Sequence, residues 1–165
     1  MLTTLENKLI TMGYSSFTND EKNAFISWVA RRNALVMSQV TDEYILNYHK
    51  QMKKEQLNID CENAIVKGFV SSNGHTYRMN RDDQLNMIGQ KDQLIMDTTV
   101  TEVSWNTEDA GYVTHTRDEW INNVYMEAFN HKKEQLNRYK LLKEKVDAAT
   151  SHEDLLKITW DMPLN

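Results

Sequence analysis

Apolar residues in the first third of the chain recur every three or four positions, and this spacing predicts helices. Residues 2–12 form the first of these helices, and Gly13 follows them as a C-terminal cap. A second helix opens at Thr18, because Glu21 three residues later gives the sequence the form of a capping box. The apolar positions expected on this second helix are Phe25, Trp28, Val29, Leu35 and Val36.

A third helix is predicted over residues 42–66, opening after Thr41 and closed by Gly68. Glu55 and Glu62 interrupt its apolar side, which makes it a poor parallel coiled coil and favours packing against a neighbouring helix. The apolar seam expected on this helix consists of Ile45, Tyr48, Met52, Ile59 and Val66.

Two later stretches are typical of β-hairpins rather than helices. The first covers residues 69–78, with Asn73-Gly74 at its centre as a strong hairpin signal. The second covers residues 100–114, where Thr- and Val-rich segments flank a turn over residues 106–111.

Capping residues mark three further helices, over residues 81–97, 117–148 and 152–160. Asn80 caps the first, and Thr116 with Glu119 has the capping-box form at the start of the longest. Helices and strands are thus mixed rather than alternating singly. The sequence predicts the α+β class, mostly helical, with a small antiparallel sheet of two hairpins packed on helices and an N-terminal helical region.

The expected domain organisation follows this change in pattern. Residues 1–62 form an N-terminal helical region that binds a partner or oligomerises, and residues 63–165 form a small α+β domain that ends in a long helix. Helices over residues 42–66 and 117–148 would be about 38 Å and about 48 Å long, more than the width of a small domain. We therefore expect these two helices to mediate self-association into a homo-oligomer.

Composition excludes several classes of protein. Of the 165 residues 40% are hydrophobic, but no apolar run approaches the roughly 20 residues of a membrane span. The first residues lack the basic start and apolar stretch of a signal peptide, so neither membrane insertion nor signal-peptide secretion is expected. Cys61 is the single cysteine, which rules out an intramolecular disulfide framework and a cysteine-rich zinc site.

The histidines are the first candidates for a metal site. Glu127 and His131 lie four residues apart on one helix face, but no second pair supplies the remaining ligands that a metal needs. His75 is expected beside a hairpin turn and His115 at a strand end, both ordinary polar edge positions. His152 belongs to the acidic first turn of a helix. We predict no metal site and no cofactor.

Nucleophilic catalysis is not indicated either. Cys61 lies between Asp60 and Glu62, whose negative charges would raise the pKa of its thiol. The carboxylate pairs Asp82-Asp83 and Glu108-Asp109 are explained by a helix start and a turn. No nucleophile elbow, phosphate-binding loop or dinucleotide fingerprint is present. We therefore predict no catalytic residue and a protein that is not an enzyme.

Binding to nucleic acid or to protein remains open. The net charge is −5, and carboxylates interrupt the basic clusters, as is typical of solvated helix faces. These clusters are Arg31-Arg32, Lys53-Lys54, Lys132-Lys133 and Lys140-Lys143-Lys145. The aromatic residues of the second half suit a core, although Tyr and Trp also anchor protein interfaces. These aromatic residues are Tyr77, Trp105, Tyr112, Trp120, Tyr125, Phe129 and Trp160.

Several segments between residues 63 and 160 occur together in a characteristic order. They include Ile65-Val66-Lys67-Gly68-Phe69, Asn73-Gly74-His75-Thr76-Tyr77, Arg81-Asp82-Asp83-Gln84, Val103-Ser104-Trp105-Asn106-Thr107-Glu108-Asp109-Ala110-Gly111-Tyr112-Val113-Thr114, Thr116-Arg117-Asp118-Glu119, Ala148-Ala149-Thr150 and Leu155-Leu156-Lys157-Ile158-Thr159-Trp160. In these segments the chain resembles a domain of unknown function found in bacteriophage tail-fibre-associated and tail-fibre-assembly-like proteins. The resemblance implies a non-enzymatic accessory of the tail, with no catalytic residue to carry over.

Two function classes follow from this. The first is a non-enzymatic bacteriophage tail protein, either a structural component of the tail, tail fibre or baseplate, or a tail-fibre assembly factor. Its expected partner is a tail-fibre or baseplate protein, and its expected location is the virion tail or the host cytoplasm during assembly. The alternative is a small intracellular phage protein that binds nucleic acid or a host factor, which rests on the lysine clusters alone.

Overall fold

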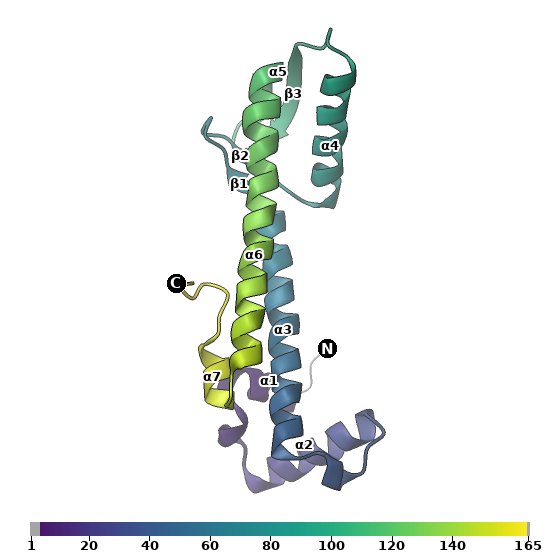
Figure 1. Cartoon of the computed structure of the whole chain (residues 1–165), viewed down its shortest axis with the longest axis vertical. Helices are drawn as coiled ribbons and strands as arrows, with labels where there is room; N and C mark the ends of the chain where they lie inside the picture. The colour runs from purple at the N-terminus through teal and green to yellow at the C-terminus, as the bar shows by residue number, and fades with distance from the viewer. Residues whose placement is uncertain (1–3, 165) are drawn as a thin grey trace. The chain divides into compact units, whose positions relative to one another are not determined.

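The computed structural model describes residues 4–164 (Figure 1). Its contacts divide the chain into two compact units. The first unit comprises Met1–Ile59 and Tyr139–Asn165, and the second comprises Asp60–Arg138. The predicted class is confirmed, because the chain is mostly helical and carries two small antiparallel two-stranded sheets packed on helices. Within the described residues no helix is both long enough and apolar enough to cross a membrane.

In the described part of the first unit, helices are the only regular secondary structure. Its elements are α1 (Thr4–Met12), the 3₁₀ turn η1 (Tyr14–Ser16), α2 (Asn19–Arg32), the 3₁₀ turn η2 (Met37–Gln39), the part of α3 (Asp42–Lys67) up to residue 59, the part of α6 (Met126–Ala148) from residue 139, and α7 (His152–Lys157). One core cluster is built on Leu9, Phe25 and Ile45, and a second on Leu57, Leu142 and Leu155. Leu2, expected in the first helix, lies outside the described residues.

Local capping signals of the first unit are confirmed. Gly13 follows α1 with a φ of 76°, in the left-handed region that favours glycine. Thr18 accepts a hydrogen bond from the N–H of Glu21, whose carboxylate in turn accepts from the N–H of Thr18. Ser151 caps α7 through the N–H of Asp154, and the helix ends at Lys157.

The expected continuation of the second helix to Val36 is wrong, because α2 ends at Arg32. Ala34 has a left-handed φ of 53°, and the N–H of Leu35 reaches back 2.8 Å to the carbonyl oxygen of Ala30. This is the hydrogen bond of a Schellman motif, which terminates a helix. Here an alanine, rather than a glycine, occupies the left-handed position.

The predicted seam of α3 is only partly correct. Ile45 and Met52 are buried, but Ile59 and Val66 are 52% and 45% exposed. An α-helix drifts by about 20° per heptad from a strict seven-residue repeat, so positions 59 and 66 rotate away from the buried side. The residues that α3 buries are spaced by three or four, apart from the adjacent Met52 and Lys53; they are Ile45, His49, Met52, Lys53, Leu57, Cys61 and Ile65.

The second unit contains both hairpins. Its elements are the end of α3, β1 (Phe69–Val70), β2 (Thr76–Tyr77), α4 (Arg81–Met96), β3 (Glu102–Thr107), β4 (Gly111–Thr116), α5 (Arg117–Glu119), the π-helical turn η3 (Trp120–Tyr125) and α6 up to residue 138. Strand β1 pairs with β2, and β3 pairs with β4. The hairpins form two sheets rather than one, although the N–H of Glu108 donates to the carbonyl oxygen of Thr76, 2.9 Å away.

The helix expected over residues 117–148 is one run of three segments, because a π-helical turn separates α5 from α6. Thr116 caps it through the N–H of Glu119. Trp120 and Val124 are fully buried within the π-helical turn. The ring of Trp120 lies 4.6 Å from that of Trp105, so the turn packs against strand β3.

The chain divides differently from the expected regions 1–62 and 63–165. Residues 139–165 belong to the same unit as the first 59, because Leu142, Val146 and Leu155 share a core with Leu57. This packing joins residues 85 or more positions apart, and no local pattern encodes it. The partner-binding or oligomerising role of the first 62 residues stays a prediction.

Candidate functional site: a groove between α4 and α6

Glu127 and His131, the first metal candidates, contact different parts of the second unit. Glu127 accepts hydrogen bonds from the hydroxyl of Ser71 and, at 3.2 Å, from the N–H of Ser72. Burial raises the pKa of this carboxyl, but the serine hydrogen bonds outweigh it and hold the pKa below its ordinary value. His131 Nε2 donates to the carbonyl oxygen of Ala64, 3.1 Å away. Both residues therefore fasten neighbouring segments to α6, and the described residues contain no group of three His, Cys, Asp or Glu that could hold a metal.

His75 and His115, both expected at polar edges, differ in their surroundings. His75 Nδ1 lies 2.9 Å from the carboxylate of Asp109, on the tip of the other hairpin. His115 lies near the end of β4, as expected, but not at a polar edge, because its side chain is only 1% exposed. Its Nε2 lies 3.1 Å from the hydroxyl of Tyr77, and its Nδ1 lies 3.3 Å from a carboxylate oxygen of Glu119.

The buried contact of His115 belongs to a larger group, which we call the Tyr77 network. Asn73 Nδ2 donates both to the Tyr77 hydroxyl at 2.9 Å and to Glu119 at 3.0 Å. This hydrogen bond from Asn73 is the main cause that lowers the pKa of the Glu119 carboxyl. The Tyr77 network thus joins the first hairpin, strand β4 and α5 through one set of polar contacts, and its role is structural.

His152 lies in the acidic first turn of α7, as expected, but it also pairs with a histidine that the sequence did not single out. Its Nδ1 lies 2.9 Å from Nδ1 of His49, which is fully buried on α3. The two rings stack with centroids 5.2 Å apart. A signal for His49 did exist, because it follows the buried Ile45 by four residues on the same helix.

Cys61 and the carboxylate pairs also have local structural roles. The thiol is buried and lies 3.5 Å from the carbonyl oxygen of Gln135, to which it donates. Burial, assisted by the charge of Glu62, raises the pKa of the thiol. Asn80 caps α4 by accepting from the N–H of Asp83, whose carboxylate accepts in turn from the N–H of Asn80. Asp109 accepts from the N–H of Thr76 at 2.7 Å.

Basic side chains from three of the four clusters form ion pairs. Arg32 contacts Glu6 at 3.1 Å, Lys54 contacts Asp147 at 2.5 Å, and Lys140 contacts Glu144 at 3.9 Å. The fourth cluster, Lys132-Lys133, instead lies at the edge of an apolar groove.

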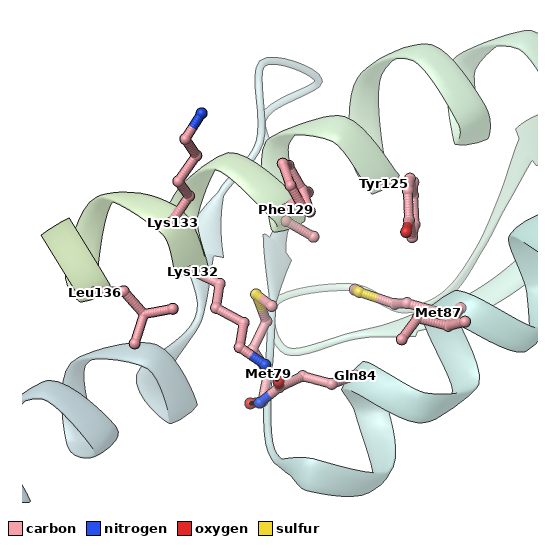
Figure 2. Close-up of a pocket in the computed structure, with 10 residues that line it drawn as sticks. Met79, Gln84, Met87, Tyr125, Phe129, Lys132, Lys133 and Leu136 are labelled. Carbon is pink, nitrogen blue, oxygen red and sulfur yellow. Dashed lines mark hydrogen bonds between the residues drawn. The ribbon is translucent and has the colours of Figure 1, made fainter.

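This groove lies in the second unit between α4 on one side and η3 with α6 on the other (Figure 2). Its volume is about 390 Å³. Eight of its ten lining residues are uncharged, and most of these are apolar. The lining consists of Met79, Gln84, Met87, Ile88, Tyr125, Ala128, Phe129, Lys132, Lys133 and Leu136.

Lysine side chains cross the groove near both ends. Lys132 on α6 donates from Nζ to the side-chain oxygen of Gln84 on α4, 2.7 Å away (Figure 2). Lys91 on α4 places its Nζ 5.5 Å from the centroid of the Tyr125 ring. The floor between these contacts includes the buried side chains of Met79 and Met87.

Apolar side chains around the groove are open to solvent. Phe129 is 54% exposed, and Ile88 and Leu136 are also exposed. The outer side of α4 adds Leu85, Ile95 and Met96, while Met87 and Leu94 form the inner side of that helix. Exposed apolar side chains that gather around a groove are a feature of interaction sites. Of these residues the sequence singles out Phe129, as an aromatic residue suited to a core, whereas its ring is exposed beside the groove.

Comparison with known proteins gives one result. The family model for a domain of unknown function (DUF4376) matches residues 48–159, about two thirds of the chain. All ten residues that line the groove fall within the matched range. No curated protein and no solved structure matches the chain.

Proposed function

We propose that this chain, which belongs to the DUF4376 family, is a non-enzymatic protein that acts through protein–protein contacts, with the groove between α4 and α6 as a contact surface. The observation that carries the proposal is the open apolar groove together with the exposed Phe129, Ile88 and Leu136 at its sides. The centre of a protein interface is apolar and enriched in aromatic residues and methionine, as this groove is.

The proposed setting is the bacteriophage tail. It rests on the resemblance of residues 63–160 to tail-fibre-associated and tail-fibre-assembly-like proteins. The partner would be a tail-fibre or baseplate protein, and the chain either stays in the virion as a structural component or leaves as an assembly factor. Self-association would use the long helices α3 and α6, which carry the exposed apolar residues Ile59, Val66 and Leu141 outside the groove lining.

The alternative, a small phage protein that binds nucleic acid or a host factor, has less support. It rests on the lysine clusters, and Lys54 and Lys140 are already engaged with carboxylates. A phosphate backbone would have to compete with these contacts. Binding of DNA or RNA at low salt that weakens as salt is added would favour this alternative over protein contacts.

Light scattering tests the proposal, first on the chain alone and then on the chain co-expressed with the tail-fibre protein encoded beside it. A stable complex that Phe129→Asp disrupts is the expected result. The matched control is Tyr112→Asp, because Tyr112 is also an exposed aromatic residue (78%) but lies on β4 and does not line the groove. The proposal is refuted if the chain stays monomeric and forms no complex with the fibre protein.

Mass spectrometry of purified virions separates the two tail roles. A structural component gives peptides at a fixed ratio to the other tail proteins. An assembly factor that leaves the fibre gives none, although the same cells contain it before the virions are released.

A further inference from the structure

The geometry points to the class of partner that the groove takes: we propose an amphipathic helix of another protein, with carboxylates beside its apolar anchors. This inference rests on the proposed function, because it assumes that the groove is a contact surface. It adds the shape and the charge of what binds there.

The shape of the occupant follows from the positions that line the groove. On η3 and α6 they include Tyr125, Ala128, Phe129, Lys132 and Leu136, which form one stripe at helical spacing, and Lys133 beside it. From Tyr125 to Leu136 this stripe rises by eleven residue steps, which is about 16 Å or three helical turns. A helix laid along it would contact α4 and α6 together, as helices do when they pack into the furrow between two others.

The charge of the occupant follows from the lysines. Among the ten lining residues the charged ones are Lys132 and Lys133, and no carboxylate is present. Lys91 adds a third positive group where it crosses to Tyr125, although Asp92 lies 2.6 Å from its Nζ. The end of the groove near Leu136 is therefore the more positive one.

A helix with apolar anchors and glutamates complements both features. Its apolar side chains would cover Phe129, Met87 and Ile88, and its carboxylates would pair with Lys132 and Lys133. Lys132 would exchange its neutral acceptor on Gln84 for a charged one, and charge-assisted hydrogen bonds are the stronger kind. The negative end of the helix dipole favours placing the C-terminus of the bound helix at this end.

Methionines give the groove some tolerance for the exact anchors. Met79 and Met87 form part of its floor, and their unbranched side chains adapt to different shapes. The choice between different partner helices therefore depends more on the lysines than on the methionines of the floor. The lysines favour an acidic helix over a basic or neutral one.

A pair of designed peptides tests the inference on the full chain. Both are capped helices of about 16 residues with leucines spaced by four and three positions, long enough to be partly helical when free. One carries glutamates beside the leucines, and the other carries lysines at the same places. Fluorescence anisotropy of a label on each peptide measures binding.

We expect the glutamate peptide to bind saturably and at least about tenfold more tightly than the lysine peptide, because two partly exposed ion pairs contribute about that much. Phe129→Asp should weaken the binding of the glutamate peptide by about tenfold or more. The double variant K132Q and K133Q should bring the two peptides to within about twofold of each other. Tyr112→Asp, the matched control, should bind as the unmodified chain does.

Three results would overturn the inference: no saturable binding of the glutamate peptide, equal binding of both peptides, or full binding by Phe129→Asp. A dimer of the chain alone that Phe129→Asp dissociates would also overturn it, because a second copy would then occupy the groove. If the fibre complex forms and depends on Phe129 while the glutamate peptide fails, the proposed function stands and the inference falls. If the peptide binds but no fibre complex forms, the groove is a contact surface for a helix, and the proposed tail-fibre partner falls.

Discussion

The contact between His49 and His152 predicts how the stability of the first unit depends on pH. The two Nδ1 atoms face each other at 2.9 Å, so one must donate and the other must accept. Nε2 of His49 is buried without a hydrogen-bond partner. A buried orphan acceptor costs less than a buried orphan donor, so we assign the proton of His49 to Nδ1 and that of His152 to its more exposed Nε2.

Acidification must place a proton on this buried pair. Burial, followed by the nearby His152 and Lys53, lowers the pKa of His49 to about 3. An unfolded histidine has a pKa of about 6.5. The unfolded state therefore binds more protons than the native state between these values, and the native state loses stability as the pH falls from about 6.5 toward about 3. At pH 5 the loss amounts to about 2 kcal/mol from this one residue.

Urea unfolding followed by circular dichroism, at intervals between pH 7.5 and pH 5, measures this loss. In His49→Leu the native state no longer holds a buried imidazole neutral, so about 2 kcal/mol of the pH dependence should disappear. In the control His152→Asn the amide oxygen can still accept from His49 Nδ1. Burial is the largest cause of the His49 shift, so this control should keep the part of the pH dependence that arises from His49. It loses the contribution of His152 itself, whose pKa burial also lowers.

The carboxyl groups do not obscure the result, because their ordinary pKa values lie below this range of pH. Several of them, such as Asp147 beside Lys54, have their pKa lowered further in the native state. The reasoning is refuted if His49→Leu and the unmodified chain lose the same free energy of unfolding between pH 7.5 and pH 5. It is also refuted if the imidazole of His49 titrates near pH 6.5 in the nuclear magnetic resonance spectrum of the folded chain.

Three further predictions concern stability in urea at neutral pH. Tyr77→Phe removes the hydroxyl at the centre of the Tyr77 network and should cost about 1–3 kcal/mol, whereas Tyr112→Phe, which alters an exposed ring, should cost almost nothing. Ala34→Gly should stabilise by about 1 kcal/mol because its φ is 53°, whereas Ala24→Gly in the exposed interior of α2 should destabilise by a similar amount. Gly68→Ala should cost more than about 3 kcal/mol, because φ is +81° and the new Cβ would lie 1.9 Å from a backbone oxygen of Tyr77.

Helix starts and hairpin turns could be predicted because their causes are local. Thr18, Asn80 and Ser151 each bind an N–H only three residues later, so the sequence contains both partners side by side. Gly74 allows the turn of the first hairpin with a φ of 88°. In such places a short window of residues holds all the information that the structure uses.

Burial could not be predicted as well, because it depends on contacts between distant segments. His49 and Lys53 are polar residues on the buried side of α3, whereas Ile59 on the same helix is exposed. Which side of α3 is covered is decided within the first unit by Leu142 and Val146, more than 80 residues away. The early end of α2 is a related case, since its Schellman motif has Ala34 where the usual signal is a glycine.

The groove is a second case in which the sequence alone could not show which residues are buried and which are exposed. Helix α4 carries apolar residues on two sides, and the second unit buries only the side with Met87 and Leu94. A helix that is apolar over much of its circumference is normally covered over that circumference. Leu85, Ile88 and Ile95 remain exposed within this chain, and each would gain free energy by leaving water. A partner that binds at the groove could bury these side chains and gain that free energy. The apolar positions of α4 therefore support a contact surface as well as helix formation.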